Sequence, residues 1–263
     1  MNNKAVDSLR ATAPQLYRFY HAQRQYLIDH SLDPDNWRRF DRSEGPRHYL
    51  NIDNYGSEAP FPALPRDRKK ADALFGKAFI IKGGLAPWTI EHRYRLLVAA
   101  FRRRDARDIV FQSAILGHYV GDVHVPVHAT ANYDGQLTKQ KGLHGRFESE
   151  MVDRSIDESQ LEIAGARRIA NPTDAAFNWI IDSWKMCEPV FKADLDASAK
   201  DALYGTEYYE IFTPRALPIA KSRLESAASD LGSLWYSAWL EAGRPALPRL
   251  KTSETNTQMK TRP

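Results

Sequence analysis

The chain has 263 residues, 43% of them hydrophobic, and a formal net charge of +4, so it is long enough to bury a substantial core. Polar residues interrupt its apolar runs well before the roughly 20 residues that a membrane span needs, which argues against a transmembrane protein. A single cysteine excludes an intramolecular disulfide and a thiolate-rich zinc site. Any metal would therefore be bound by His, Asp and Glu.

The N-terminal region combines a helical segment with a long irregular one. Residues 4–31 have apolar positions close to helical spacing, with a break expected near Pro14. Residues 32–68 are rich in proline and glycine. A segment of this length without regular structure is more often functional than idle in a compact domain.

Two helices are predicted in the centre of the chain. The first covers residues 90–103, with Thr89 as its N-cap. The second begins near Ala106 and is ended by Pro126, since proline cannot continue a helix.

The C-terminal half also favours helices, over residues 144–155, 173–193 and 214–241. Few stretches alternate with the period of two that strands require, so the sequence predicts an all-α fold. Nothing divides residues 1–248, which we expect to form one globular multi-helix domain. The polar tail over residues 249–263 has no periodicity and is predicted to be disordered.

The histidines are clustered: four of the eight lie within 27 residues, namely His118, His124, His128 and His144. His118 and Asp122 are four apart, which places both side chains on one face of a helix. His144 and Glu148 repeat this spacing, and His128 follows a proline between the two pairs. Five nitrogen and oxygen donors of this kind suit a borderline cation such as zinc.

These motifs resemble a known family. HYVGD, Pro126 with His128, NYDG and GLHGRFE are similar to the signature of bacterial zinc-dependent phospholipases C and the related zinc-dependent single-strand nucleases of fungi and plants. EGPRHYLNID and LWYSAWLEAG resemble further segments of the family, so the resemblance covers roughly residues 1–248.

The resemblance implies an all-α fold around a cluster of three zinc ions. Carried over by motif, one zinc would be held by Asp33, His48, His118 and Asp122, and a second by His128, His144 and Glu148. Asp33 would also orient or deprotonate the nucleophilic water, and Asp35 is the alternative for this position. Asp122 would bridge to a third zinc.

The third site is where this chain departs from the family. There it is completed by an N-terminal tryptophan and a nearby histidine, whereas here residue 1 is Met, the first tryptophan is Trp37 and the first histidine is His21. We expect either that this chain begins at an internal methionine, with the first turn of the domain missing, or that the third site has been lost. Two zinc sites are therefore expected, with the third in question.

The implied function is a monomeric zinc-dependent phosphodiester hydrolase, acting on phospholipids or single-stranded nucleic acid. The glutamate that ends GLHGRFE and the 15-residue gap before His144 resemble the phospholipase branch, whereas the basic isoelectric point favours nucleic acid. The alternative is a degenerate, non-catalytic zinc-binding member of the family. Relatives are exported, so a secreted or periplasmic protein is expected, although this chain shows no signal peptide.

Overall fold

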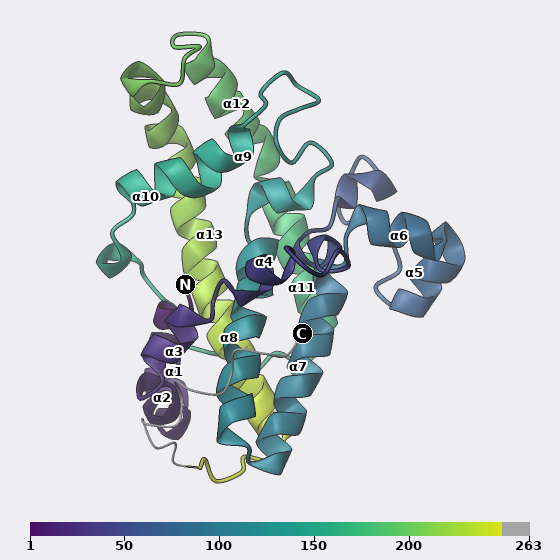
Figure 1. The fold of residues 1–263 in the computed structure, drawn as a ribbon, viewed down its shortest axis with the longest axis vertical. Coiled ribbons are helices and arrows are strands. Elements are labelled where there is room, and N and C mark those ends of the chain that lie inside the picture. Colours follow the sequence, from purple (N-terminus) through teal and green to yellow (C-terminus); the bar gives the residue numbers. More distant parts are fainter. Residues whose placement is uncertain (249–263) are drawn as a thin grey trace.

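A computed structural model describes residues 1–248, and all regular elements in that range are helices (Figure 1). The expectation of an all-α fold is confirmed. The α-helices are α1 (Asn2–Thr12), α2 (Pro14–His21), α3 (Arg24–Asp29), α4 (Asp33–Trp37), α5 (Arg68–Phe75), α6 (Lys77–Gly83), α7 (Ala86–Arg103), α8 (Ala106–Val123), α9 (Leu143–Gly145), α10 (Met151–Ser155), α11 (Pro172–Trp184), α12 (Cys187–Ser198) and α13 (Thr206–Glu241). Short helical turns are η1 (Gly45–His48), η2 (Ile52–Tyr55), η3 (Pro126–Ala129), η4 (Arg146–Glu150) and η5 (Glu158–Gln160).

The helices of the N-terminal half agree closely with the prediction from the sequence, except at the starts of α3 and α7. The predicted break near Pro14 separates α1 from α2, and a second break separates α2 from α3. Thr89 is not an N-cap: α7 already begins at Ala86, because Pro87 in its first turn needs no hydrogen-bonded backbone N–H. The Thr89 hydroxyl instead donates to the Leu85 carbonyl within the helix.

The C-terminal helices differ from prediction in length. The expected helix over 173–193 is two helices, α11 and α12, separated by a turn. The last helix is longer than predicted, since α13 begins at Thr206 and continues through Pro214 and Pro218. The hydrogen bonds lost at these prolines are offset by packing, because the residues before them, including Phe212, are buried.

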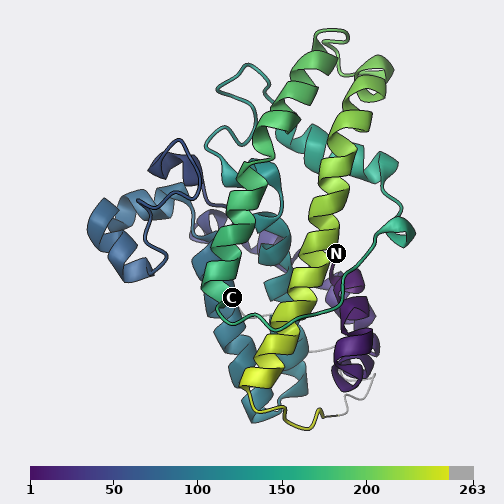
Figure 2. The same ribbon diagram turned by 180° about the vertical axis from the view of Figure 1, so that it is seen from behind.

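Two hydrophobic clusters share α13 as their common wall. The larger cluster lies among α1, α7, α8, α11 and the C-terminal half of α13. The smaller lies among α9, α10, α12 and the N-terminal half of α13, and contains Leu143, Phe147, Tyr208 and Phe212. Figures 1 and 2 show α13 running lengthwise through the molecule past both groups of helices. The site described below lies where the two groups meet.

The tail predicted to be disordered, residues 249–263, lies outside the described residues. Among residues 1–248, no helix combines the length and apolar character needed to cross a bilayer.

Candidate metal centre

Helix α8 supplies the two central donors of the site. Asp105 caps the start of α8 by accepting hydrogen bonds from the backbone N–H groups of Arg107 and Asp108. Most residues along the helix are buried in the core, and most of these are apolar. The expected pairing holds: Nε2 of His118 lies 3.5 Å from Oδ2 of Asp122, one turn further along. Both side chains are largely buried at the C-terminal half of the helix.

His48 is brought to this pair from an irregular segment by backbone hydrogen bonds on both sides. The Leu85 and Ala86 N–H groups donate to the carbonyls of Pro46 and Tyr49. This close approach requires Gly84, because a Cβ there would lie 2.2 Å from the Tyr49 carbonyl oxygen and the φ angle is +107°. The side chain of His48 is only 3% exposed.

The first donor group consists of Asp35, His48 and His118, with Asp122 beside it. Nδ1 of His48 lies 3.0 Å from Nε2 of His118 and 3.0 Å from Oδ2 of Asp122. The Asp35 carboxylate oxygens lie 3.7 Å from His48 and 3.8 Å from His118. Ligand atoms of a tetrahedral zinc site, about 2.1 Å from the metal, lie about 3.4 Å from one another, so these separations fit a single ion.

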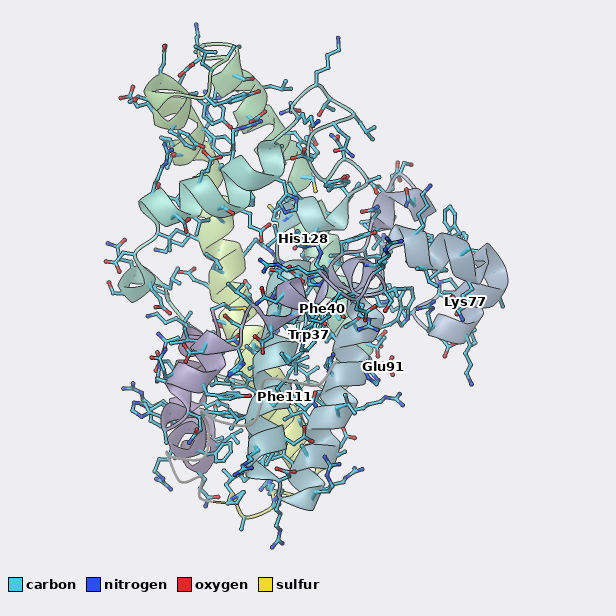
Figure 3. The ribbon with its side chains drawn as sticks, in the orientation of Figure 1. Trp37, Phe40, Lys77, Glu91, Phe111 and His128 are labelled. Carbon is cyan, nitrogen blue, oxygen red and sulfur yellow. The ribbon has the colours of Figure 1, made fainter. Side chains whose placement is uncertain are left out.

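The second donor group consists of His128, His144 and Glu148. Oε2 of Glu148 lies 2.7 Å from Nε2 of His144 and 3.2 Å from Nε2 of His128. The predicted i,i+4 pair therefore shares one helix face, even though residues 146–150 form a wider turn than an α-helix. His128 lies near the middle of the molecule, between the upper and lower helices (Figure 3).

Asp122 lies between the two groups. Its Oδ2 faces His48 and His118, whereas its Oδ1 lies 3.6 Å from Nδ1 of His128. Asp122 therefore contacts the donor nitrogen of His48 in the first group and the Nδ1 side of the His128 ring in the second, so the two groups are neighbours.

Hydrogen bonds on the far side of the rings fix which nitrogen is free to bind a cation. Nδ1 of His118 lies 2.8 Å from the Ser31 carbonyl, and Nδ1 of His128 lies 2.8 Å from the His48 carbonyl. Because a carbonyl only accepts, each Nδ1 carries a proton, and in the neutral ring Nε2 then offers a lone pair. Oδ2 of Asp122 is buried, and its close polar contacts are with the ring nitrogens of His48 and His118. Lone pairs that converge in this way fit a bound cation.

The charges of the centre are mutually dependent. Burial by itself lowers the pKa of His48, but the neighbouring carboxylates of Asp122 and Glu44 raise it to about 9. Burial likewise opposes charge on His128, and Glu148 with Asp122 raises its pKa to about 9. Burial raises the pKa of Glu148, but the facing histidines hold it below its ordinary value. The neighbouring histidines likewise lower the pKa of Asp122, so these two carboxylates are ionised and require positive charge beside them.

The centre opens into a cavity with a volume of about 670 Å³. The donors Asp35, His118, Asp122, His128, His144 and Glu148 line it. The lining also includes apolar side chains, among them Leu32, Phe147 and Val152, and the charged side chains of Arg38, Arg223 and Glu158. A cavity of this size with convergent polar groups and apolar walls is typical of a small-molecule site.

The structure brings together six of the seven predicted ligands, His48, His118, Asp122, His128, His144 and Glu148, and it separates the seventh. Asp33 lies at the start of α4, where its carboxylate is 2.7 Å from Nδ1 of His30. Asp35, the alternative from the sequence, lies next to His48 and His118. The two carboxylates are two residues apart in α4 and therefore point to nearly opposite sides of the helix, and the spacing in DPD could not decide which one faces the cavity.

Glu44 is a buried partner of the centre that sequence reasoning missed. Its side chain is 1% exposed, and its Oε1 lies 3.5 Å from Nε2 of His48 and accepts from the Tyr119 hydroxyl. Burial opposes its charge, but His48, Tyr119 and Arg47 together lower its pKa to about 2. The sequence EGPRH places Glu44 four residues before His48, and this spacing could have indicated that the two side chains lie on one face of a helical turn.

A second missed feature anchors the helix that carries His144 and Glu148. Arg146 is buried on the opposite side of that helix, where Nη2 and Nε donate to Oδ1 of Asp194 at 2.8 and 3.0 Å. Its guanidinium also stacks on the Tyr204 ring, 3.9 Å from the centroid. This buried ion pair fixes the helix against α12 and α13.

No family model and no curated protein matches this chain. The candidate centre is therefore defined by its own geometry.

Proposed function

We propose that this protein is a zinc-dependent phosphodiester hydrolase. The observation that carries the proposal is the pair of neighbouring His/carboxylate donor groups, with Asp122 between them, that open into one cavity. Imidazole and carboxylate donors without a thiolate suit zinc, and neighbouring metal sites are typical of phosphate-ester hydrolysis. The sequence resemblance supports the same assignment.

Bound zinc would supply Lewis acidity and would lower the pKa of a coordinated water from 15.7 towards about 7. His48, His118, Asp35 and Asp122 would hold one ion, and His128, His144 and Glu148 the other. The role that the resemblance gives to Asp33 passes here to Asp35, because only Asp35 lies beside both histidines. Asp35 is half-exposed at the cavity, so its carboxylate is placed to orient the attacking water or accept its proton.

The cavity walls support a phosphodiester substrate. Arg38 carries a positive charge beside Asp35, at 3.4 Å, and is placed to attract a phosphoryl group. The apolar part of the lining, which includes Leu32, Phe147 and Val152, suits the non-polar portion of such a substrate. Both a phospholipid and a single-stranded nucleic acid carry the required diester.

The test is metal content followed by hydrolysis. Elemental analysis of the purified chain is expected to find two zinc ions per molecule. Turnover of phosphatidylcholine or single-stranded DNA is expected with metal and not with chelator. Bound zinc without hydrolysis of either substrate would instead support the non-catalytic alternative, and absence of zinc would overturn both.

A further inference from the structure

Helices α5 and α6 project from the side of the molecule as a separate lobe, seen from both faces in Figures 1 and 2. We use "lobe" for residues 66–84. This segment contains six basic residues against two acidic ones, a net charge of +4, which equals the formal charge of the whole chain. The rest of the chain is therefore neutral overall. Within the lobe, Arg66 pairs with Asp174 of α11 at 3.1 Å, so the positive charge left unpaired is that of the lysines.

The lysines of the lobe are not neutralised by its acidic residues. Asp67 caps α5 by accepting from the Lys70 backbone N–H, and Asp72 pairs with Nε of Arg68 at 2.8 Å. The four lysines are exposed, and none has a carboxylate partner among the described residues: Lys69, Lys70, Lys77 and Lys82. Figure 3 shows Lys77 on this lobe, away from His128.

Large apolar side chains lie exposed among these lysines. Leu74 is 63% exposed and Phe79 is 44% exposed. Leu74 follows Lys70 by one helical turn, so both lie on the same side of α5. Phe79 is supported from behind by ring contacts with Phe75 and Tyr55. The exposed apolar groups are thus held on a packed base.

We propose that the lobe is a docking surface for an anionic lipid bilayer. Lysines attract the negative surface of such a bilayer, and their long stems allow the ammonium groups to remain at the headgroups. Leucine and phenylalanine enter the boundary between headgroups and acyl chains. This surface is separate from the metal centre and does not depend on the proposed hydrolysis.

A nucleic acid fits the lobe less well than a bilayer. Proteins that bind single strands use a positively charged groove lined with several aromatic rings. The lobe projects outward instead, and its exposed large apolar residues are one leucine, which cannot stack on a base, and one phenylalanine. A projecting tip that carries apolar residues among lysines suits a bilayer, because the bilayer surface is flat and charged and its interior is apolar.

Vesicle flotation with the full chain tests the proposal. The metal-bound protein is mixed on ice with vesicles of phosphatidylcholine alone, or of phosphatidylcholine and phosphatidylserine at a ratio of three to one, and the recovered lipid is checked for hydrolysis. Binding is expected only to the anionic vesicles. Because each lysine contributes about fivefold to such binding, Lys70→Gln with Lys77→Gln is expected to weaken it roughly 25-fold. Leu74→Ser alone is expected to weaken it about tenfold.

A matched control uses an exposed lysine and leucine elsewhere. Lys200→Gln with Leu203→Ser changes the same residue types in the turn between α12 and α13, where Leu203 is 92% exposed. This variant is expected to bind as the parent does, and circular dichroism confirms that each variant is folded. Absence of binding by the parent, or equal loss in the control, would overturn the proposal. The proposal would also be overturned if the parent bound a single-stranded oligonucleotide but not vesicles, and the lobe variants lost that oligonucleotide binding.

Discussion

The two donor groups of the centre are built in opposite ways. The first combines Asp35 of α4 and His48 of η1 with His118 of α8, which lies 70 residues beyond His48 in the chain. The second takes all its donors from one short stretch, His128 to Glu148. Burial differs as well: the His48 side chain is 3% exposed, whereas that of His144 is 33% exposed. The first group depends on the tertiary fold, and the second on local helix geometry.

This difference predicts which donor group tolerates the loss of a ligand or of its metal. A buried charged donor that loses its partner leaves an uncompensated group in a dry environment, which costs folding free energy. A half-exposed donor can be replaced by water. The first group therefore couples metal binding to folding, and the second can lose metal without loss of the fold.

Asp122 lies beside the donor nitrogens of the first group and also approaches the His128 ring, so its replacement is expected to have the largest effect. In Asp122→Asn the neutral amide cannot balance the facing histidines, and affinity for the first metal should fall by more than about 100-fold, since even indirect partners contribute 10- to 100-fold. The second site should weaken less, because only Oδ1 of Asp122 approaches His128. Competition with a coloured chelator measures both affinities. The exposed Asp182→Asn is the control, and equal loss at both sites would contradict the asymmetry.

Asp35 and Asp33 provide a matched pair within one helical turn. Asp35→Asn is expected to lower turnover on the order of 100-fold, as loss of a general base does. Asp33→Asn should leave turnover near the parent value, because its carboxylate pairs with His30 rather than with the first donor group. Steady-state hydrolysis of a phosphodiester compares the two. A larger loss in Asp33→Asn would restore the assignment made from the resemblance alone.

The same contrast explains how much the sequence could predict. The i,i+4 pairs, His118 with Asp122 and His144 with Glu148, follow from helix periodicity, and the structure keeps both. The choice between Asp33 and Asp35 depends on how α4 lies against α8, which no local pattern encodes. Thr89 was misplaced because a cap and an interior threonine look alike when a proline precedes them.

The buried supports of the centre were also beyond the sequence. Glu44 lies four residues before His48, but the glycine and proline between them gave no indication from sequence that this segment forms a helical turn. The partner of Arg146 is Asp194, which is 48 residues away in the chain. Pairs of this kind are set by the packing of distant helices, so only the fold shows them.

Glu44 tests whether the first group depends on support from behind its ligands. Glu44→Gln keeps the shape of the side chain but removes the negative charge facing Nε2 of His48. Affinity of the first site is expected to fall roughly tenfold, while the second site is unchanged. Isothermal titration with zinc measures both sites. An equal fall at the second site would show that Glu44 acts through general stability, and thermal unfolding of the variant is the control.

The smallest expected effect is a pH dependence of stability that reverses with metal. In chelator-treated protein, His48 and His128 have pKa values raised to about 9 by their carboxylate neighbours, against an ordinary value of 6.5. Their contribution to stability is therefore fully present below pH 6.5 and is lost as the pH rises through 9. With zinc the sign reverses, since ligand binding requires deprotonated histidines, and stability should rise over the same interval.

Thermal unfolding at pH 6.5 and pH 9, with and without chelator, measures this reversal. A change of a few degrees in Tm is expected in each direction, which is the scale of about 1 kcal/mol in a domain of this size. His128→Asn should reduce the slope of the chelated protein, because it removes one of the two raised histidines. Parallel slopes with and without chelator would show that protons and metal do not compete for these nitrogens, and the two donor groups would then be buried ion pairs rather than a metal centre.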